Sequence, residues 1–203
     1  MKLTIGSIVD ACLWAAPDAP AATLGDGQRS FRQLDSFANQ CARVLAAHGA
    51  APGDLVAWWA GAALRTLDGF LACARLGAVF APVNPALPAE EAGATLEYLQ
   101  PRVLVADDGH AEPAAVLAAQ LGVPLLVFGA RRAPGIGLDA AMHSASASCL
   151  GTEVDDLSPH ILYLTSGSTG RRRARWSATG RAGCVRRVAA ARSAGTWTAP
   201  AAW

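Results

Sequence analysis

The chain has 203 residues, enough for one domain of ordinary size or a large piece of a bigger one, and 52% of them are apolar, so a substantial core can form. No stretch approaches the roughly 18 uninterrupted apolar residues of a membrane span, and Asp10 interrupts the apolar start, so neither a transmembrane helix nor a signal peptide is predicted. The five cysteines form no C-x-x-C pair, which argues against a zinc or thioredoxin-like motif and favours a reducing, cytoplasmic location.

The net charge of +1 conceals a sharp division along the chain. Residues 1–170 carry nine basic and sixteen acidic side chains, a net of −7, whereas residues 171–203 carry eight arginines and no acid, a net of +8. We therefore treat 1–170 and 171–203 as separate regions.

Helix and strand signals alternate through most of the first region. Gly49 and Gly77 each follow an apolar periodic segment at the position where a C-terminal helix cap belongs. A hairpin turn at 25–27 separates two short strands, 22–24 and 30–31. The predicted helices are 7–16, 31–48, 64–76, 88–99 and 111–121, and the predicted strands are 55–60, 79–83, 103–106, 124–128 and 161–164. Short links between alternating elements predict an α/β fold with a mostly parallel sheet.

Two segments do not follow this alternation of helix and strand signals. Residues 129–158 are rich in Gly, Ala and Ser and show little periodicity, so we expect a loop leading to the strand at 161–164. Residues 171–203 show neither a helical nor a strand period, and we predict an irregular, disordered tail whose Arg, Ala and Trp bias is compositional.

The candidate site is the turn that follows the strand at 161–164. Its residues are hydroxyl-bearing or glycine, so side-chain hydroxyls and backbone N–H groups can surround an anionic phosphate. They are Thr165, Ser166, Gly167, Ser168, Thr169 and Gly170. It is not a Walker A loop, because no G-K-[ST] follows. Its place at the end of an alternating α/β region is where such sheets bind ligands.

Tyr163 to Gly170 resembles the phosphate loop of the AMP-forming acyl-adenylating family, which includes acyl-CoA synthetases, peptide-synthetase adenylation domains and luciferases. The resemblance extends over residues 5–170. Asn84 favours acyl-CoA synthetases, since peptide-synthetase domains more often carry Asp at that point. The other matching segments are Ser30-Phe31-Arg32-Gln33-Leu34-Asp35, Pro52-Gly53-Asp54-Leu55-Val56-Ala57, and Leu76-Gly77-Ala78-Val79-Phe80-Ala81-Pro82-Val83-Asn84-Pro85 followed by Leu87-Pro88-Ala89-Glu90-Glu91.

The resemblance implies a two-step reaction. A carboxylic acid attacks the α-phosphorus of ATP to give an acyl adenylate and pyrophosphate, and a thiol, usually coenzyme A, then displaces AMP. Mg²⁺ assists by neutralising phosphate charge. On this basis the residues from Thr165 to Gly170 would hold the β- and γ-phosphates of ATP. The implied partners are a small-molecule carboxylic acid and ATP, and neither nucleic acid nor a membrane span is expected.

The resemblance ends abruptly after Gly170. The family continues with a pattern like Arg-Pro-Lys-Gly, in which Lys contacts phosphate, whereas here no Lys follows Lys2. The codons CGC CCG AAG GGC GCG GTG GTC AGC CAC CGG encode the family-like Arg-Pro-Lys-Gly-Ala-Val-Val-Ser-His-Arg. Deleting one C from the first CCC yields Arg-Arg-Arg-Ala-Arg-Trp-Ser-Ala-Thr-Gly, the sequence at 171–180. We predict that 171–203 is translated out of frame.

If so, the family's later catalytic elements are missing, and we predict that the chain alone is inactive and prone to aggregation at its uncovered sheet edges. Two alternatives remain. The arginines and tryptophans of 171–203 could bind nucleic acid through phosphates and stacking. The chain could instead be a non-catalytic regulator that pairs with a full-length homologue.

Overall fold

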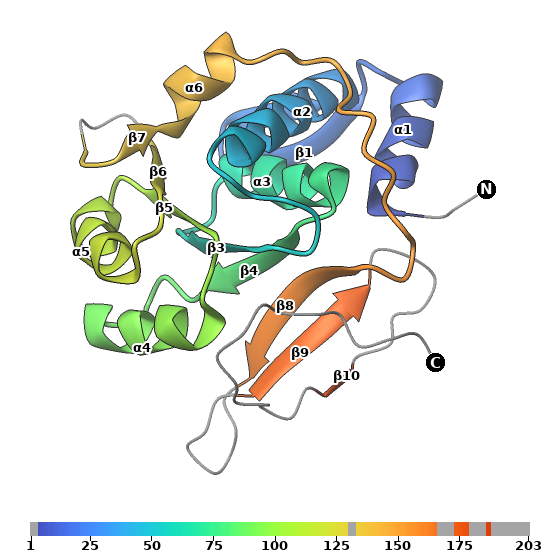
Figure 1. Cartoon of the computed structure of the whole chain (residues 1–203). Helices are drawn as coiled ribbons and strands as arrows, with labels where there is room; N and C mark the ends of the chain where they lie inside the picture. Colours follow the sequence, from blue (N-terminus) through green and yellow to red (C-terminus); the bar gives the residue numbers. More distant parts are fainter. Residues whose placement is uncertain (1–3, 130–132, 166–172, 179–185, 188–203) are drawn as a thin grey trace.

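The computed structural model describes residues 4–129, 133–165, 173–178 and 186–187. Its helices are α1 (Ile5–Ala15), α2 (Phe31–Ala47), α3 (Leu64–Leu76), α4 (Ala89–Leu99), α5 (Ala111–Leu121) and α6 (Leu138–Ser144). Its strands are β1 (Pro20–Leu24), β2 (Gly27–Ser30), β3 (Leu55–Trp59), β4 (Val79–Val83), β5 (Val103–Asp107), β6 (Leu125–Phe128), β7 (Ile136–Gly137), β8 (Pro159–Thr165), β9 (Arg173–Ala178) and β10 (Arg186–Arg187). Figure 1 shows these elements in sequence colours.

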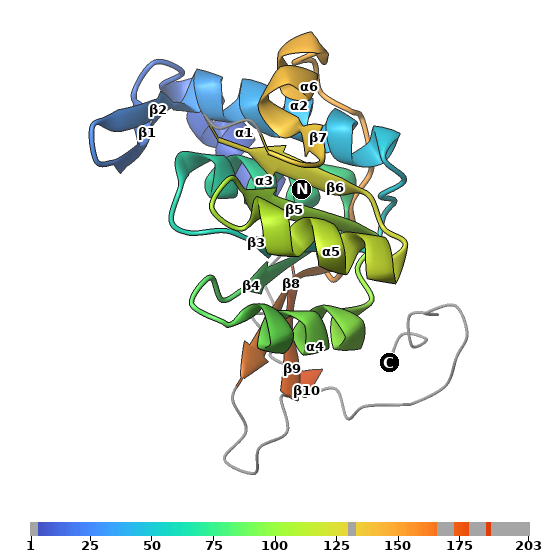
Figure 2. The ribbon, with the colours of Figure 1, turned by 90° about the vertical axis from the view of Figure 1, so that its left-hand side faces the viewer.

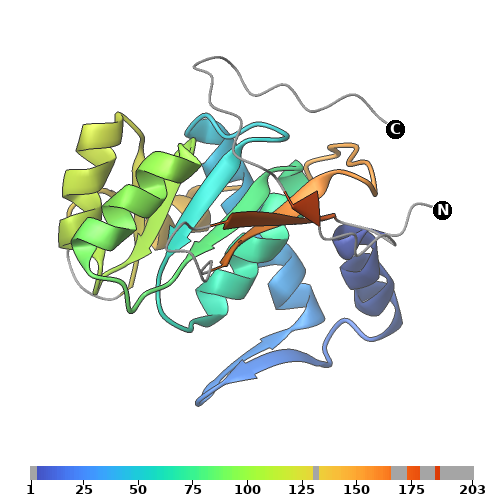
Figure 3. The same ribbon diagram turned by 90° about the horizontal axis from the view of Figure 1, so that it is seen from below.

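Within the described residues, one large sheet has the strand order β10-β9-β8-β4-β3-β5-β6-β7. The six strands from β8 to β7 run parallel, and β9 and β10 are added antiparallel at one edge. Strands β1 and β2 form a separate hairpin that projects away from the sheet (Figure 3). The predicted α/β fold with a mostly parallel sheet is confirmed.

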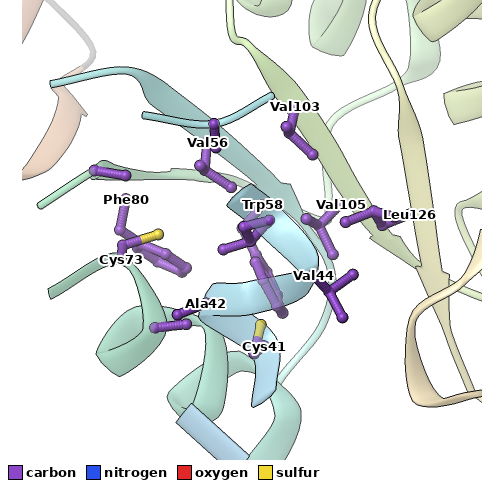
Figure 4. Close-up of a cluster of buried hydrophobic side chains, with 14 of the residues drawn as sticks. Cys41, Ala42, Val44, Val56, Trp58, Cys73, Phe80, Val103, Val105 and Leu126 are labelled. Atoms are coloured by element: carbon purple, nitrogen blue, oxygen red, sulfur yellow. The ribbon is translucent and has the colours of Figure 1, made fainter. Parts of the chain in front are cut away.

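Helices cover the sheet on both faces (Figure 2). On one face α2, α3 and α6 pack on alternate strand residues, with Trp58 near the centre of that cluster (Figure 4). On the other face α4 and α5 pack on the intervening residues, which include Trp59. Both tryptophans are 1% exposed. Two successive buried tryptophans on opposite faces are expected in a central strand of a parallel sheet, because such strands have no solvent-facing side.

Local sequence signals explain several helix ends. Ser30 accepts a hydrogen bond from the Gln33 amide while the Gln33 side chain accepts one from the Ser30 amide, which forms a capping box that starts α2. Gly77 ends α3 and Gly122 ends α5, and both adopt the left-handed conformation that glycine reaches without steric cost.

The expectation of a plain loop over 129–158 is wrong in its middle. Residues 136–144 form the short strand β7 and then α6, which buries Leu138 and Met142 against the sheet. Beyond α6, side chains of α2 hold the chain through its backbone. Asn39 and Gln40 donate to the carbonyls of Ala147 and Ala145, and Arg43 donates to those of Ser148 and Cys149. We call residues 145–149 the strap.

Within 171–203 the structure describes two strands, β9 and β10. Strand β9 pairs antiparallel with β8 from Pro159↔Ala178 to Thr165↔Arg173, and β10 pairs with β9. The rest of this region lies outside the described residues. The proposal that it is out of frame stays a prediction.

No helix in the described part of the chain combines the length and the apolar character needed to cross a lipid bilayer.

Candidate functional site

The carboxyl ends of the parallel strands meet at one edge of the sheet, and the chain leaves that edge in two directions. Strand β3 leads into α3 on one face, whereas its two neighbours, β4 and β5, lead into α4 and α5 on the other. In open α/β sheets, ligands bind at the crevice where connections diverge in this way. We call the region where these carboxyl ends meet the ligand edge.

At the ligand edge, hydrogen bonds between polar side chains and backbone groups connect the segments that follow β3 and β5. The Asp107 carboxylate, at the end of β5, accepts hydrogen bonds from the Gly61 amide (2.8 Å) and the His110 amide (3.0 Å). Its Oδ1 also lies 2.5 Å from His110 Nδ1. The other ring nitrogen of His110, Nε2, lies 3.0 Å from the carbonyl oxygen of Pro85, in the turn after β4. One histidine therefore links the loops that follow three adjacent strands.

The network has a defined charge pattern. Burial alone would raise the pKa of Asp107, but hydrogen bonds from the Gly61 amide and from His110 outweigh burial, and the net pKa lies below its ordinary value. Asp107 is thus an ionised carboxylate. Both partners of the His110 ring, the Asp107 carboxylate and the Pro85 carbonyl, are hydrogen-bond acceptors.

Asn84 organises the turn after β4. Asn84 Oδ1 accepts from the Ala86 amide (3.0 Å), and the Asn84 carbonyl accepts from the Leu87 amide (3.2 Å). Strand β8 runs parallel to β4 with Phe80 opposite Ile161.

The structure places Thr165 as the last residue of β8, at the ligand edge where the sequence predicts it. The other predicted site residues, Ser166, Gly167, Ser168, Thr169 and Gly170, lie outside the described residues. Their assignment to phosphate binding stays a prediction.

A second charged cluster lies where α3 begins, just beyond β3. The Asp68 side chain is 0% exposed, and Arg65 contacts it at 2.9 Å while Arg29 of β2 lies at 3.8 Å. Arg65 also pairs with Asp139 of α6 (2.7 Å), and the guanidinium groups of Arg65 and Arg29 both lie over the Phe37 ring. Burial raises the pKa of Asp68 to about 6 despite the two arginines. This cluster holds the β1–β2 hairpin and α6 onto α3.

Sequence inspection did not single out the Asp107–His110 network. The available signal was an Asp-x-x-His spacing directly after the predicted strand 103–106, which places both side chains at the carboxyl end of that strand. Its link to Pro85, 25 residues earlier, depends on the strand order and is not encoded in local spacing. Among the described residues, no group of three or more His, Cys, Asp or Glu side chains could hold a metal ion.

Comparison with known proteins gives a consistent result. A family model described as "AMP-binding enzyme" matches residues 12–174. Surfactin synthase subunit 3 of Bacillus subtilis (strain 168) is 32% identical over 157 residues, which is 77% of this chain and 12% of that protein. Feruloyl-CoA synthase of Amycolatopsis sp is 35% identical over 156 residues, 77% of this chain and 29% of that protein.

Among solved structures, ATP-bound MatB from Rhodopseudomonas palustris superposes with a TM-score of 0.77 at 25% identity, covering 88% of this chain and 35% of that one. The chain therefore spans less than a third of these two curated relatives and about a third of this structural neighbour.

Proposed function

This chain belongs to the AMP-binding enzyme family, and we propose that it is the N-terminal part of an ATP-dependent ligase that activates a carboxylic acid as an acyl adenylate. The relatives support this class in general terms, because they include both a peptide synthetase and a CoA ligase. Asn84 favours transfer of the acyl group to coenzyme A over a peptide-synthetase thiol.

The phosphate loop from Thr165 to Gly170 is the part of this chain that would act on ATP. Its hydroxyls and amides would donate to the β- and γ-phosphate oxygens, and glycine at 167 and 170 would let the backbone approach them. Mg²⁺ would neutralise phosphate charge, and the described residues offer no cluster of three or more His, Cys, Asp or Glu to hold it.

The proposal is supported by the extent of the family match and by the position of Thr165 in the sheet. The family match runs through the loop to residue 174, and β8 delivers Thr165 to the edge where parallel strands end. Calorimetric titration with ATP tests it. Thr169→Val should weaken ATP binding by roughly 10-fold or more, because a hydrogen bond to a charged group contributes about 1.5–3 kcal/mol. Ser144→Ala, on the exposed side of α6, is the matched control and should leave binding unchanged. If Thr169→Val and Ser144→Ala bind ATP with equal affinity, the loop is not part of the ATP site.

We further propose that the chain alone does not complete adenylation and that its Arg-rich region replaces the natural continuation. The absence of any lysine after Lys2 supports this, since the family uses a lysine directly after the loop. ATP–pyrophosphate exchange should be undetectable with a panel of fatty and aromatic acids. Clear exchange with any acid would refute this point and leave the proposed ATP site standing.

The cytoplasm is the proposed location. Cys12, Cys41, Cys73 and Cys149 are all free thiols in the structure. Burial raises the pKa of Cys41 to about 12, so it stays a protonated, unreactive side chain in the core. This pattern of unpaired cysteines favours a reducing compartment.

A further inference from the structure

His110 joins segments that follow three different strands. It follows β5, and β4 and β5 lie on either side of β3, yet its Nε2 lies 3.0 Å from the Pro85 carbonyl oxygen in the turn after β4. The ring packs against Trp59, with 5.0 Å between the centroids, and the side chain is 23% exposed. The tryptophan limits rotation of the imidazole, so Nδ1 stays directed at Asp107 while Nε2 stays directed at Pro85.

The number of protons on the ring decides how many of these contacts are hydrogen bonds. Burial would raise the pKa of Asp107, but hydrogen bonds from Gly61 and His110 outweigh it, so this carboxylate is an acceptor at neutral pH. The Pro85 carbonyl is an acceptor at every pH. A neutral imidazole carries a proton on one nitrogen, whereas an imidazolium carries one on each. Only the imidazolium can therefore donate to both partners.

In the neutral form the proton is expected on Nδ1. An ionised carboxylate accepts a hydrogen bond roughly twice as strong as the one that a neutral carbonyl accepts, so Asp107 retains the proton in preference to Pro85. The Nε2 lone pair then faces the lone pairs of the Pro85 oxygen at 3.0 Å. Two acceptors at this distance repel each other, so the contact with Pro85 opens.

We propose that His110 is a pH-dependent latch, whose imidazolium form ties the Asn84–Leu87 turn to β5 and whose neutral form releases that turn. The latch is closed at low pH and opens as the pH rises through the titration of His110. Histidine is the side chain whose charge ordinarily changes near physiological pH. The latch needs no bound ligand, so it stands or fails independently of the proposed function.

The surroundings of the ring define what the test must control. β5 presents the Asp107 carboxylate, β3 presents the uncharged Trp59 ring, and the turn after β4 presents the Pro85 carbonyl. Two more carboxylates are close in sequence, Asp108 before the ring and Glu112 in the first turn of α5. Both remain in every variant used below.

Two variants hold the latch in its two states. In His110→Gln the side-chain amide nitrogen takes the place of Nε2, so the bond to Pro85 is kept at every pH. In His110→Asn the amide nitrogen takes the place of Nδ1, so the bond to Asp107 is kept and the bond to Pro85 is absent at every pH. Neither amide titrates, and the two variants introduce the same functional group.

Amide hydrogen exchange between about pH 5 and pH 8, corrected for the intrinsic exchange rate, measures the state of the turn. The reporters are the Ala86 and Leu87 amides, which bond to Asn84. In the unmodified chain their protection should fall by about 10-fold as the pH rises, with the midpoint that ¹⁵N spectra give for His110. Protection should stay high in His110→Gln and low in His110→Asn. The Gly61 amide, which Asp107 holds, should not respond.

Three outcomes would overturn the latch. The first is protection at Leu87 that does not follow the titration of His110, and the second is an equal loss of protection in His110→Gln. The third is a His110 ring that keeps one protonation state over the whole range. If the variants do not fold, ¹⁵N spectra of the unmodified chain decide: a proton on Nδ1 of the neutral ring supports the latch, and a proton on Nε2 contradicts it.

Discussion

The burial of the His160 side chain destabilises the folded state. It is 0% exposed at the start of β8, its ring meets Phe70 edge-on at 4.4 Å, and neither ring nitrogen has a hydrogen-bond partner among the residues that the structure describes. Burial lowers its pKa to about 4, against an ordinary value near 6.5. A buried polar ring without partners costs free energy of folding at every pH, and the cost rises when the ring must be protonated.

The pH dependence follows from where protons bind. Between pH 6.5 and pH 4 the unfolded chain takes up a proton on His160 that the folded chain does not, so stability falls as the pH is lowered through this window. Asp68 acts in the opposite sense, because its raised pKa of about 6 lets the folded state bind a proton first, and its contribution grows as the pH falls. The two effects overlap and partly cancel in the unmodified protein.

We predict that His160→Leu separates them. At pH 7 the variant should be at least as stable as the unmodified protein, because two unpartnered nitrogens are removed. At pH 5 its advantage should grow by about 2 kcal/mol, since a shift of one pKa unit corresponds to about 1.4 kcal/mol. Urea unfolding at the two pH values measures this. His143→Gln, an exposed histidine on α6, is the control. An advantage that does not change with pH would mean that His160 titrates normally in the fold.

Gly69 is fixed by a tryptophan rather than by backbone conformation. A Cβ at this position in α3 would lie 2.2 Å from the Trp58 ring, a distance that requires the ring or the helix to move. We predict that Gly69→Ala lowers the free energy of unfolding by about 1–3 kcal/mol through overpacking, although alanine favours helix. Gly6→Ala, in α1 with no atom closer than 3.7 Å, should be neutral or slightly stabilising. Thermal unfolding of both variants tests the contrast, and equal effects would contradict it.

At the level of elements, polar side chains of α2 hold the strap in place by donating hydrogen bonds to its backbone carbonyls. Arg43 donates to the backbone of the strap at Ser148 (3.0 Å) and Cys149 (3.3 Å), more than 100 residues away in sequence. The strap leads the chain back across the molecule to β8, so these bonds help to place the strand that carries Thr165 (Figure 1).

We predict that Arg43→Met releases the strap. The loss of charge-assisted bonds to carbonyls should cost about 1–2 kcal/mol and should increase proteolytic cleavage within residues 145–158. Arg32→Met is a matched control, because Arg32 forms an exposed ion pair with Asp18 and exposed pairs contribute little. Limited proteolysis with mass spectrometry would report the cleavage sites, and equal cleavage in both variants would show that Arg43 does not hold the strap.

The elements that sequence predicted well are those with strong local signals. Helix 31–47 has the Ser30 capping box and buried residues at spacings of three and four, and α3 and α5 end at left-handed glycines. Helix α6 was missed because seven residues with only Leu138 and Met142 buried give too short a period to detect. The strap was missed because its hydrogen bonds are accepted by backbone carbonyls. Every residue has a backbone carbonyl, so the sequence carries no signal for these bonds.

The candidate site was predicted in part. The hydroxyl- and glycine-rich loop and its position after a strand are visible in the sequence, since composition determines both. The Asp107–His110–Pro85 link depends on β4 and β5 lying on either side of β3, and strand order is a tertiary property. Sequence therefore indicated the loop but not the Asp107–His110–Pro85 link at the ligand edge.

For the whole molecule, the division of charge at residue 170 and the end of the family match at residue 174 fall close together. Pairing between β8 and β9 is formed by backbone groups, so it does not require the side chains that the family uses after its loop. An out-of-frame segment can thus complete a sheet edge without supplying the chemistry. The fold of the described residues before the loop therefore does not depend on the side chains that the proposed activity needs.

The final prediction tests that separation at the level of the gene. If the codons after 171 are displaced by a single base, as we propose, inserting one nucleotide after codon 171 should restore an Arg-Pro-Lys-Gly continuation and open a longer reading frame. The longer product should catalyse ATP–pyrophosphate exchange with at least one carboxylic acid, whereas the present chain should not. Inserting three nucleotides at the same place keeps the frame and serves as the control. If the shifted frame meets a stop codon at once, residues 171–203 are a genuine continuation, and the explanation for the missing lysine must be sought in selection rather than in a lost base.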